Sequence, residues 1–248
     1  MDDVRSTARS SLACLDLTSL NDADTAADIE RLCRRAQGPQ GAVAAVCVWP
    51  RFAALARARL PASIAVAAVA NFPDGGSDIG RALRDTAAIV EAGAQEIDVV
   101  MPYRDLAAAP ALLAAVRRAG AGLRLKIILE TGELRDESLI RHAARLALDA
   151  GADFLKTSTG KTATSATPDA ARLLLQAIAQ GGHTKVGFKA AGGIRSVADA
   201  AVYMQLTALH LGAAAVGPQR FRIGASALLD DIEAVLGGGP GAAAPGAY

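Results

Sequence analysis

Cysteine is scarce in this chain of 248 residues, and the few cysteines present form no pattern. Cys14, Cys33 and Cys47 are odd in number and lack the paired spacing of zinc or iron–sulfur ligands. A secreted domain held together by disulfides would have an even and larger set. The sequence therefore predicts free thiols in a reducing compartment, with no metal centre.

Long hydrophobic runs are also missing. The longest apolar runs, AVAAVCVW and IAVAAVA, are much shorter than the ~20 residues that span a bilayer. The opening MDDVRSTARS lacks the basic and then apolar segments of a secretory signal. The net charge is +1, and the basic residues are spread over most of the chain, so no basic footprint for nucleic acid or acidic membranes is visible. We expect a soluble, cytoplasmic protein with neither kind of partner.

Lysine is the third scarce residue. The 26 basic residues include only five lysines, Lys126, Lys156, Lys161, Lys185 and Lys189. Arginine serves wherever a generic positive charge is enough, but its guanidinium does not lose its proton in proteins, whereas a lysine amine can. The lysines are therefore candidates for positions that need an amine.

The chain is rich in short apolar runs that alternate with amphipathic segments. We expect strands at 43–49, 64–70, 96–101, 124–129, 153–157 and 186–190, with weaker patterns at 213–216 and 221–224. Helices are expected at 24–36, 77–93, 104–119, 136–151, 168–180, 196–210 and 226–236. Eight strand–helix units predict a single-domain (β/α)8 TIM barrel. An open doubly wound sheet is the alternative, but no Gly-x-Gly-x-x-Gly follows the first strand.

The expected domain organisation is simple. Residues 1–236 would form the catalytic barrel. Residues 237–248, GGGPGAAAPGAY, have no periodicity and predict a flexible tail that ends in Tyr248.

Polar residues stand near the ends of the predicted strands, where the functional groups of a barrel gather. Asp98, Lys156 and Lys189 interrupt otherwise apolar strands, and Glu130 follows another. An ion pair left in the core is the alternative explanation. Buried pairs add little stability compared with apolar residues of the same shape, so a functional site is favoured.

Two lysines brought together have a chemical consequence. Burial and a neighbouring ammonium lower the pKa of an amine, and a neutral amine is a nucleophile. With a carbonyl substrate, Lys156 or Lys189 would form a Schiff base, as in metal-independent aldolases, and Asp98 would move protons. Lys126 and Lys185 lie nearer the starts of their strands, where we expect them to be solvated or paired.

Two glycine-rich turns suggest a phosphate pocket. AGGIRS contains Gly192 and Gly193, and IGASALL, with Gly224 and Ser226, opens the last helix. Backbone N–H groups at such turns and at a helix N-terminus suit an anion. Glycines also end helices and fit tight turns, so the pair alone is weak evidence.

Eight segments taken together resemble the deoxyribose-phosphate aldolase family over about residues 10–236: CLDLTSLND, VCVWPRF, VANFPDG, EIDVVMPY, KIILETGEL, GADFLKTSTGK, VGFKAAGGIR and RIGASALL. The resemblance implies a (β/α)8 barrel that reversibly cleaves 2-deoxy-D-ribose 5-phosphate to D-glyceraldehyde 3-phosphate and acetaldehyde. It also implies that no metal or organic cofactor takes part. The expected partners are therefore small phosphosugars and aldehydes.

The resemblance also implies roles for particular residues. Lys156 matches the Schiff-base lysine, Lys189 the second lysine, and Asp98 the acid/base aspartate. Asp16 matches an aspartate of the supporting polar network. The positions that match substrate and phosphate contacts are Thr159, Gly160, Lys161, Gly192, Gly193, Gly224 and Ser226.

Three matches leave alternatives open. Ala227 stands beside Ser226 where relatives have a second small hydroxyl residue, a departure that bears slightly on phosphate affinity but not on the reaction. Cys47 matches a cysteine near the aldehyde pocket, or is simply a buried thiol. Tyr248 matches a terminal tyrosine that assists proton exchange in relatives, or is a frayed end. Family members are commonly dimers, so a homodimer is an expectation that no sequence feature decides.

Two other functions stay open at this stage. One is a Schiff-base aldolase for a different phosphosugar, and the other is a non-catalytic phosphosugar-binding barrel. A silent barrel would be expected to lose at least one costly buried charge, whereas Asp98, Lys156 and Lys189 are all present.

Overall fold

Eight parallel strands form the centre of the structure, a computed structural model that describes residues 2–238. In chain order the barrel strands are β1 (Leu15–Thr18), β4 (Ala45–Val48), β5 (Ala65–Ala70), β6 (Glu96–Val100), β7 (Arg124–Ile128), β8 (Phe154–Lys156), β9 (Gly187–Ala191) and β10 (Phe221–Ala225). The first strand, β1, pairs with both β4 and β10, so the sheet is closed. The predicted (β/α)8 barrel is confirmed.

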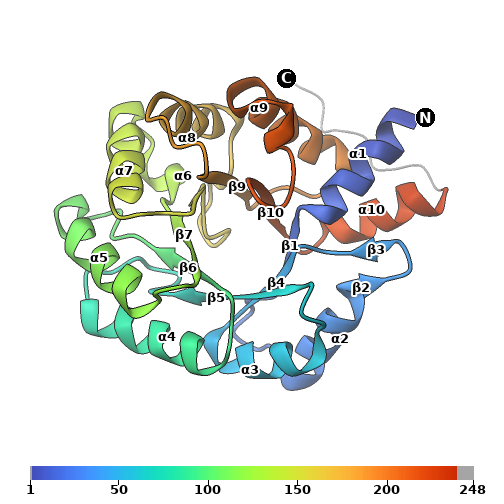
Figure 1. The fold of residues 1–248 in the computed structure, drawn as a ribbon, viewed down its shortest axis with the longest axis horizontal. Coiled ribbons are helices and arrows are strands. Elements are labelled where there is room, and N and C mark those ends of the chain that lie inside the picture. Colours follow the sequence, from blue (N-terminus) through green and yellow to red (C-terminus); the bar gives the residue numbers. More distant parts are fainter. Residues whose placement is uncertain (1, 239–248) are drawn as a thin grey trace.

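Helices surround the barrel as an outer ring (Figure 1). They are α1 (Asp2–Ala13), α2 (Ala26–Arg35), α3 (Pro50–Arg59), α4 (Ile79–Glu91), α5 (Ala109–Ala119), α7 (Glu137–Asp149), α8 (Pro168–Gln180), α9 (Val197–Leu211) and α10 (Leu228–Gly237). The short helix α6 (Thr131–Leu134) follows β7 and lies inside this ring. Two 3-10 helices, η1 (Leu106–Ala108) and η2 (Ala213–Ala215), and a small hairpin, β2 (Gln37–Gly38) with β3 (Gly41–Ala42), complete the chain. Within residues 2–238, no helix combines the length and apolarity needed to cross a membrane.

One predicted strand is wrong. Residues 213–216 contain the 3-10 helix η2 rather than a strand, because alanine favours helical backbone and the segment has a single β-branched residue. The missing barrel strand is β1, LDLT, which has four residues and a buried carboxylate, Asp16, at its second position. Such a strand has no continuous apolar run in the sequence, because its inward face carries a charged residue.

The helix boundaries follow the expected capping residues. The hydroxyl of Thr167 accepts a hydrogen bond from the backbone N–H of Ala170, Pro168 opens α8, and Gly181 follows its last residue. The helices α1, α3 and α6 were not expected. The last helix, α10, extends through Gly237, one residue beyond the helix end expected from the sequence. The rest of that tail from residue 239, including Tyr248, lies outside the described residues.

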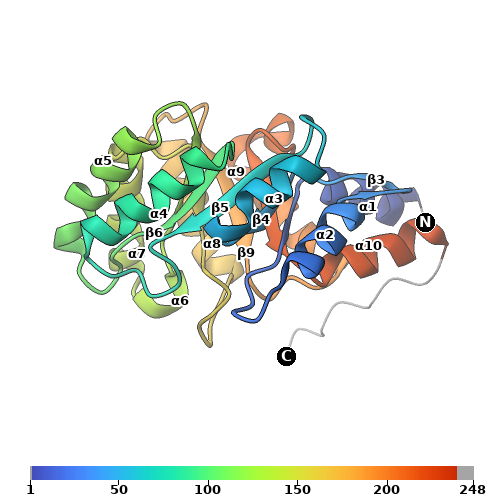
Figure 2. The same cartoon turned by 90° about the horizontal axis from the view of Figure 1, so that it is seen from below.

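The inside of the barrel is polar, whereas the layer between strands and helices is apolar. Alternate residues of a strand point to opposite faces, so Glu96 and Asp98 share one face of β6 and Ile97 lies on the other. Asp98 reaches Lys189 on β9 at 2.8 Å, across the barrel, which shows that the charged face points inward. Segments that follow strand ends, including α6 and the loops after β1 and β8, gather at one edge of the barrel in Figure 2.

Candidate active site

Seven charged side chains fill the middle of the barrel, and each residue is at most 3% exposed. The carboxylates are Asp16, Glu96 and Asp98, and the cations are Lys126, Lys156, Lys189 and Arg222. They come from β1, β6, β7, β8, β9 and β10. Buried charges are tolerated only when they are paired, and each member of this group contacts at least one opposite charge.

Asp98 is the hub of the group. Its Oδ1 accepts a hydrogen bond from Lys126 Nζ at 2.7 Å. Its Oδ2 accepts from both Lys156 Nζ and Lys189 Nζ, each at 2.8 Å. Strand register produces this meeting, because Asp98 is the direct partner of Lys126 and Lys156 is the direct partner of Lys189. The two lysines predicted to act together therefore share one carboxylate oxygen.

The two amines differ in their tendency to hold a proton. Burial, and then the positive charge of Lys189, lower the pKa of Lys156, although Asp98 opposes them. Burial also acts against charge at Lys189, but Asp16 and Asp98 outweigh it and raise the pKa of Lys189. Asp16 lies 2.5 Å from Lys189 Nζ. The site can thus hold a neutral, nucleophilic Lys156 beside a charged Lys189.

A second layer of charges lies deeper in the barrel. Lys126 Nζ lies 3.1 Å from Asp16 and 2.5 Å from Glu96, in addition to its contact with Asp98. Arg222 binds Asp16 and Glu96 at 2.5 and 3.0 Å. Burial disfavours the charge on Asp98, but Lys126 and the two other lysines outweigh it and hold the pKa of Asp98 well below its usual range. Asp98 is therefore an ionised acceptor.

Sequence reasoning expected Lys126 to be solvated or paired, and it is paired; Lys185 is exposed. Two members of the charged cluster, Glu96 and Arg222, were not predicted from the sequence. The signal for Glu96 was available, because it stands two residues before Asp98 and so shares its strand face. Arg222 likewise stands two residues before Gly224, a predicted site residue, and so lies on the same face of its strand.

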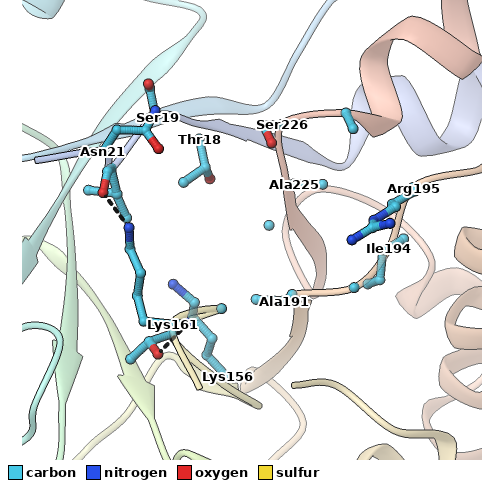
Figure 3. Close-up of a pocket in the computed structure, with 17 residues that line it drawn as sticks. Thr18, Ser19, Asn21, Lys156, Lys161, Ala191, Ile194, Arg195, Ala225 and Ser226 are labelled. Carbon is cyan, nitrogen blue, oxygen red and sulfur yellow. Dashed lines mark hydrogen bonds between the residues drawn. The ribbon is translucent and has the colours of Figure 1, made fainter. Parts of the chain in front are cut away.

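Lys156 also lies at the wall of a cavity of about 300 Å³ at the strand ends, shown in Figure 3. All seven predicted substrate and phosphate positions outside the buried cluster line this cavity: Thr159, Gly160, Lys161, Gly192, Gly193, Gly224 and Ser226. Sequence reasoning missed Arg195, although it follows the predicted glycine turn, and the segment Thr18, Ser19, Leu20 and Asn21. Ala227 lines the cavity as well.

The cavity is electropositive. Figure 3 places Lys161 on one side and Arg195 on the other, with Lys156 between them. The lining residues that the structure describes include no carboxylate. A wall of this kind suits a phosphate group.

Other predicted site residues lie beneath this cavity rather than on its wall. Asp16, Asp98 and Lys189 are fully buried in the ion-paired cluster. Cys47 is also fully buried, and its Sγ lies 3.9 Å from Asp98 Oδ2. Burial and the charge of Asp98 raise the pKa of the Cys47 thiol, so the thiol is neutral in this cluster. Within residues 2–238, no three acidic, histidine or cysteine side chains are grouped as metal ligands.

Gly224 shows why one of the predicted glycines is needed. A Cβ at this position would lie 3.0 Å from Cε of Lys189 and 3.0 Å from Cβ of Ala191. The glycine thus leaves room for the long side chain of Lys189 to reach Asp16 and Asp98.

Comparison with known proteins agrees with this arrangement. The model of the DeoC/LacD family of aldolases matches residues 10–233, which is most of the chain. The chain belongs to this aldolase family. The aldolase is 46% identical, over 98% of its length and 97% of the relative, to a protein named deoxyribose-phosphate aldolase from Agrobacterium fabrum.

Solved structures share the fold of the aldolase. A candidate deoxyribose-phosphate aldolase from Toxoplasma gondii ME49 superposes with a TM-score of 0.87 at 26% identity, covering 96% of this chain and 98% of the other. The deoxyribose phosphate aldolase of Aeropyrum pernix, described as tetrameric, gives 0.73 at 26% identity, covering 94% and 97%. The protein is thus an enzyme, a carbon–carbon lyase of the Schiff-base type that is general for its family.

Proposed function

We propose that this aldolase reversibly cleaves 2-deoxy-D-ribose 5-phosphate to D-glyceraldehyde 3-phosphate and acetaldehyde through an imine on Lys156. The single observation that carries the assignment is the position of Lys156. Its amine has a lowered pKa, is bound to Asp98, and borders a cationic cavity without a carboxylate among its described lining residues. An amine nucleophile and an anion site within one small cavity fit a phosphorylated aldehyde.

The first half of the reaction forms the imine. Neutral Lys156 Nζ attacks the aldehyde carbon C1, and the resulting carbinolamine loses water to become an iminium ion. Asp98 Oδ2 can accept the proton that Lys156 releases, because it already contacts that nitrogen. The charged Lys189, bound to the same oxygen, can supply the proton that leaves with the hydroxyl as water.

The second half breaks the carbon–carbon bond. Lys189, neutral after its donation, can accept the proton of the C3 hydroxyl as the C3 carbonyl forms, and can later return it to C2 of the enamine. The C2–C3 bond breaks, and its electron pair moves to the iminium as an enamine. This releases D-glyceraldehyde 3-phosphate. Protonation of the enamine at C2 and addition of water then release acetaldehyde and return neutral Lys156.

The phosphate would lie between the two glycine turns. Lys161 and Arg195 supply positive charge, and Ser226 supplies a hydroxyl. The helix α10 has no side-chain cap at Ala227, which leaves its first backbone N–H groups available to an anion. The alanine found in place of a hydroxyl residue is therefore compatible with phosphate binding.

Reduction with borohydride in the presence of acetaldehyde tests the proposal. The expected product is an N-ethyl group on Lys156, a mass increase of about 28 Da located by peptide mapping. Lys156→Arg is the control, because a guanidinium forms no imine, and it should abolish both labelling and cleavage of deoxyribose 5-phosphate while the protein stays folded. Labelling of another lysine would contradict the assignment.

A different phosphosugar is the competing substrate. Activity on a different phosphosugar can be distinguished from the proposed activity with a panel of phosphorylated 2-deoxy aldoses and ketoses. The product aldehydes are measured directly. We also propose a cytoplasmic homo-oligomer, a dimer by resemblance to the family, which light scattering on the purified enzyme would measure.

A further inference from the structure

Glu130 is a buried carboxylate for which the reaction above has no use. It follows β7, is fully buried, and belongs neither to the cavity wall nor to the ion-paired cluster around Asp98. Its partners are donors on the segment after β8. The Thr159 hydroxyl donates to Oε2 at 2.5 Å, and the Thr162 hydroxyl donates to Oε1 at 3.2 Å. The Thr159 backbone N–H lies 3.2 and 3.3 Å from the two oxygens.

The backbone of Glu130 is itself unusual. Its φ and ψ are both 56°, in the left-handed region that favours glycine and asparagine. A glutamate remains there only where its surroundings determine the conformation. Here the surroundings are the three donors of Thr159 and Thr162, so the side chain and not the backbone explains why a glutamate occupies this turn.

The contacts of Glu130 extend to the cavity through Thr159. The Thr159 hydroxyl donates to Glu130 and accepts a hydrogen bond from the backbone N–H of Lys161 at 3.0 Å. The ammonium of Lys161 then donates to the carbonyl of Leu20 at 2.7 Å, and both residues line the cavity. Glu130 is therefore connected by two hydrogen bonds to the main chain of one of the three cations on the cavity wall.

The same segment packs on the glycine turn. A Cβ built on Gly192 would lie 2.5 Å from Oγ of Ser165 and 3.1 Å from Cα of Gly160. The segment 159–165 thus lies in direct contact with the turn expected to bind phosphate. A small displacement of the segment would change the separation between Lys161 and Gly192.

We propose that Glu130 is a positioning residue for the phosphate end of the substrate, which it serves by holding the segment 159–162 against the glycine turn. This inference rests on the proposed function for the identity of the substrate. It predicts a larger effect on anion binding than on imine formation, because Glu130 has no direct contact with Lys156 and acts on it only through their charges. Both carboxylate oxygens serve as acceptors, because the backbone N–H and hydroxyl of Thr159 and the hydroxyl of Thr162 lie against them.

The test compares E130Q with the wild-type enzyme. Glutamine has the same size, but its neutral amide oxygen is a weaker acceptor for the hydroxyl and N–H of Thr159 than a carboxylate oxygen. We expect the dissociation constant of inorganic phosphate, measured by calorimetry, and the KM for deoxyribose 5-phosphate each to rise about tenfold. The rate of acetaldehyde trapping on Lys156 and the KM for unphosphorylated 2-deoxyribose should each change by about twofold at most.

Two further variants complete the design. Thr162→Val removes one donor without touching the link from Thr159 to Lys161, so its effect on phosphate binding should be about twofold at most. E130D keeps the charge but withdraws it from Thr159 by one methylene group, so it should reproduce the phosphate defect of E130Q, which keeps the proposal testable if E130Q does not fold. Thermal unfolding followed by circular dichroism establishes which variants are folded.

The outcomes separate the inference from the proposed function. Unchanged phosphate affinity in folded E130Q or E130D would overturn the inference, and so would a parallel loss of phosphate binding and acetaldehyde trapping. Failure of the wild-type enzyme to cleave deoxyribose 5-phosphate would overturn the proposed function instead. The phosphate calorimetry would still decide the role of Glu130 in that case.

Discussion

At the scale of single residues, the central feature is one carboxylate oxygen that contacts two amines. Asp98 Oδ2 binds Lys156 and Lys189 equally closely, but the remaining neighbours of the two lysines differ. Asp16 contacts Lys189 directly and keeps it charged. Lys156 has no such second carboxylate among its hydrogen-bond partners in the described structure and lies on the cavity wall. The nucleophile is thus selected by its partners rather than by its residue type.

Replacing Lys189 by leucine should shift the pH dependence of imine formation. The ammonium of Lys189 lowers the pKa of Lys156, so its removal raises that pKa. A higher pKa leaves less neutral amine at neutral pH, and the rate profile should move to the alkaline side. The matched control is Lys185→Leu, because Lys185 is exposed and lies two residues before the start of β9. Profiles of acetaldehyde trapping against pH measure this, and an unmoved profile for Lys189→Leu would mean that the two amines are not coupled.

Replacing Lys126 by methionine should destabilise the fold. Its ammonium contacts three buried carboxylates, Asp16, Glu96 and Asp98, and its removal leaves them undercompensated. Loss of one partner of a buried ion cluster costs about 3–5 kcal/mol. Urea unfolding at pH 7 measures the loss. Lys161→Met, an exposed lysine of the cavity rim, should leave stability nearly unchanged and weaken phosphate binding instead.

At the scale of elements, strand ends and helix starts together form the site. The helix α9 begins with a capping box in which the Ser196 hydroxyl accepts from the N–H of Asp199 and the Asp199 carboxylate accepts from the N–H of Ser196. The same carboxylate accepts from the N–H of Arg195 at 3.0 Å. The cap therefore stabilises the helix and also fixes the main chain at the arginine of the cavity wall.

Ser196→Ala should reduce stability and phosphate affinity together. Loss of an N-cap hydroxyl costs about 1 kcal/mol of folding free energy. The matched control is Asp78→Ala, which removes the N-cap of α4 in a part of the ring that does not line the cavity. Urea unfolding should show similar losses for both variants, and only Ser196→Ala should raise the KM for the phosphosugar. A KM that rises equally in both variants would contradict a local role for this cap.

At the scale of the whole molecule, the barrel encloses charge where many barrels enclose branched apolar side chains. The pKa values of Asp16, Glu96 and Asp98 are lowered because nearby cations outweigh the effect of burial. Those of Lys126, Lys189 and Arg222 are raised because nearby carboxylates outweigh it. The stability of the fold is consequently linked to pH on both sides of neutrality.

Stability should be greatest across neutral pH and fall at both extremes. The lowered carboxylate pKa values contribute stability that is present above the unfolded-state pKa, about 4, and is lost as the pH falls. The raised lysine pKa values contribute stability that is present below about 10.4 and is lost as the pH rises through the folded-state values. Urea unfolding from pH 3 to 11 tests this. An acid limb as steep in Lys126→Met as in wild type would show that the central cluster is not its source.

Much of the candidate site could be predicted from the sequence because its charged residues interrupt the apolar pattern of the strands. Lys156, Lys189 and Asp98 interrupt apolar runs, so position in a strand and residue type were enough to select them. The barrel followed from alternating strands and helices. The strand β1 could not be found in this way, because an inward-facing Asp16 removes the apolar signal, and the alanine-rich segment at 213–216 supplied a false one.

The sequence by itself determined which residue types reach the middle of the barrel and in which order along the chain. Only the tertiary structure decided which lysine stays charged and which can become neutral, because each pKa depends on neighbours brought together from strands far apart in sequence. Asp16 and Lys189 are separated by 173 residues and lie 2.5 Å apart, a contact that keeps Lys189 charged while Lys156 can become neutral. Glu130 meets Thr159 for the same reason, since neighbouring parallel strands end at the same edge of the barrel.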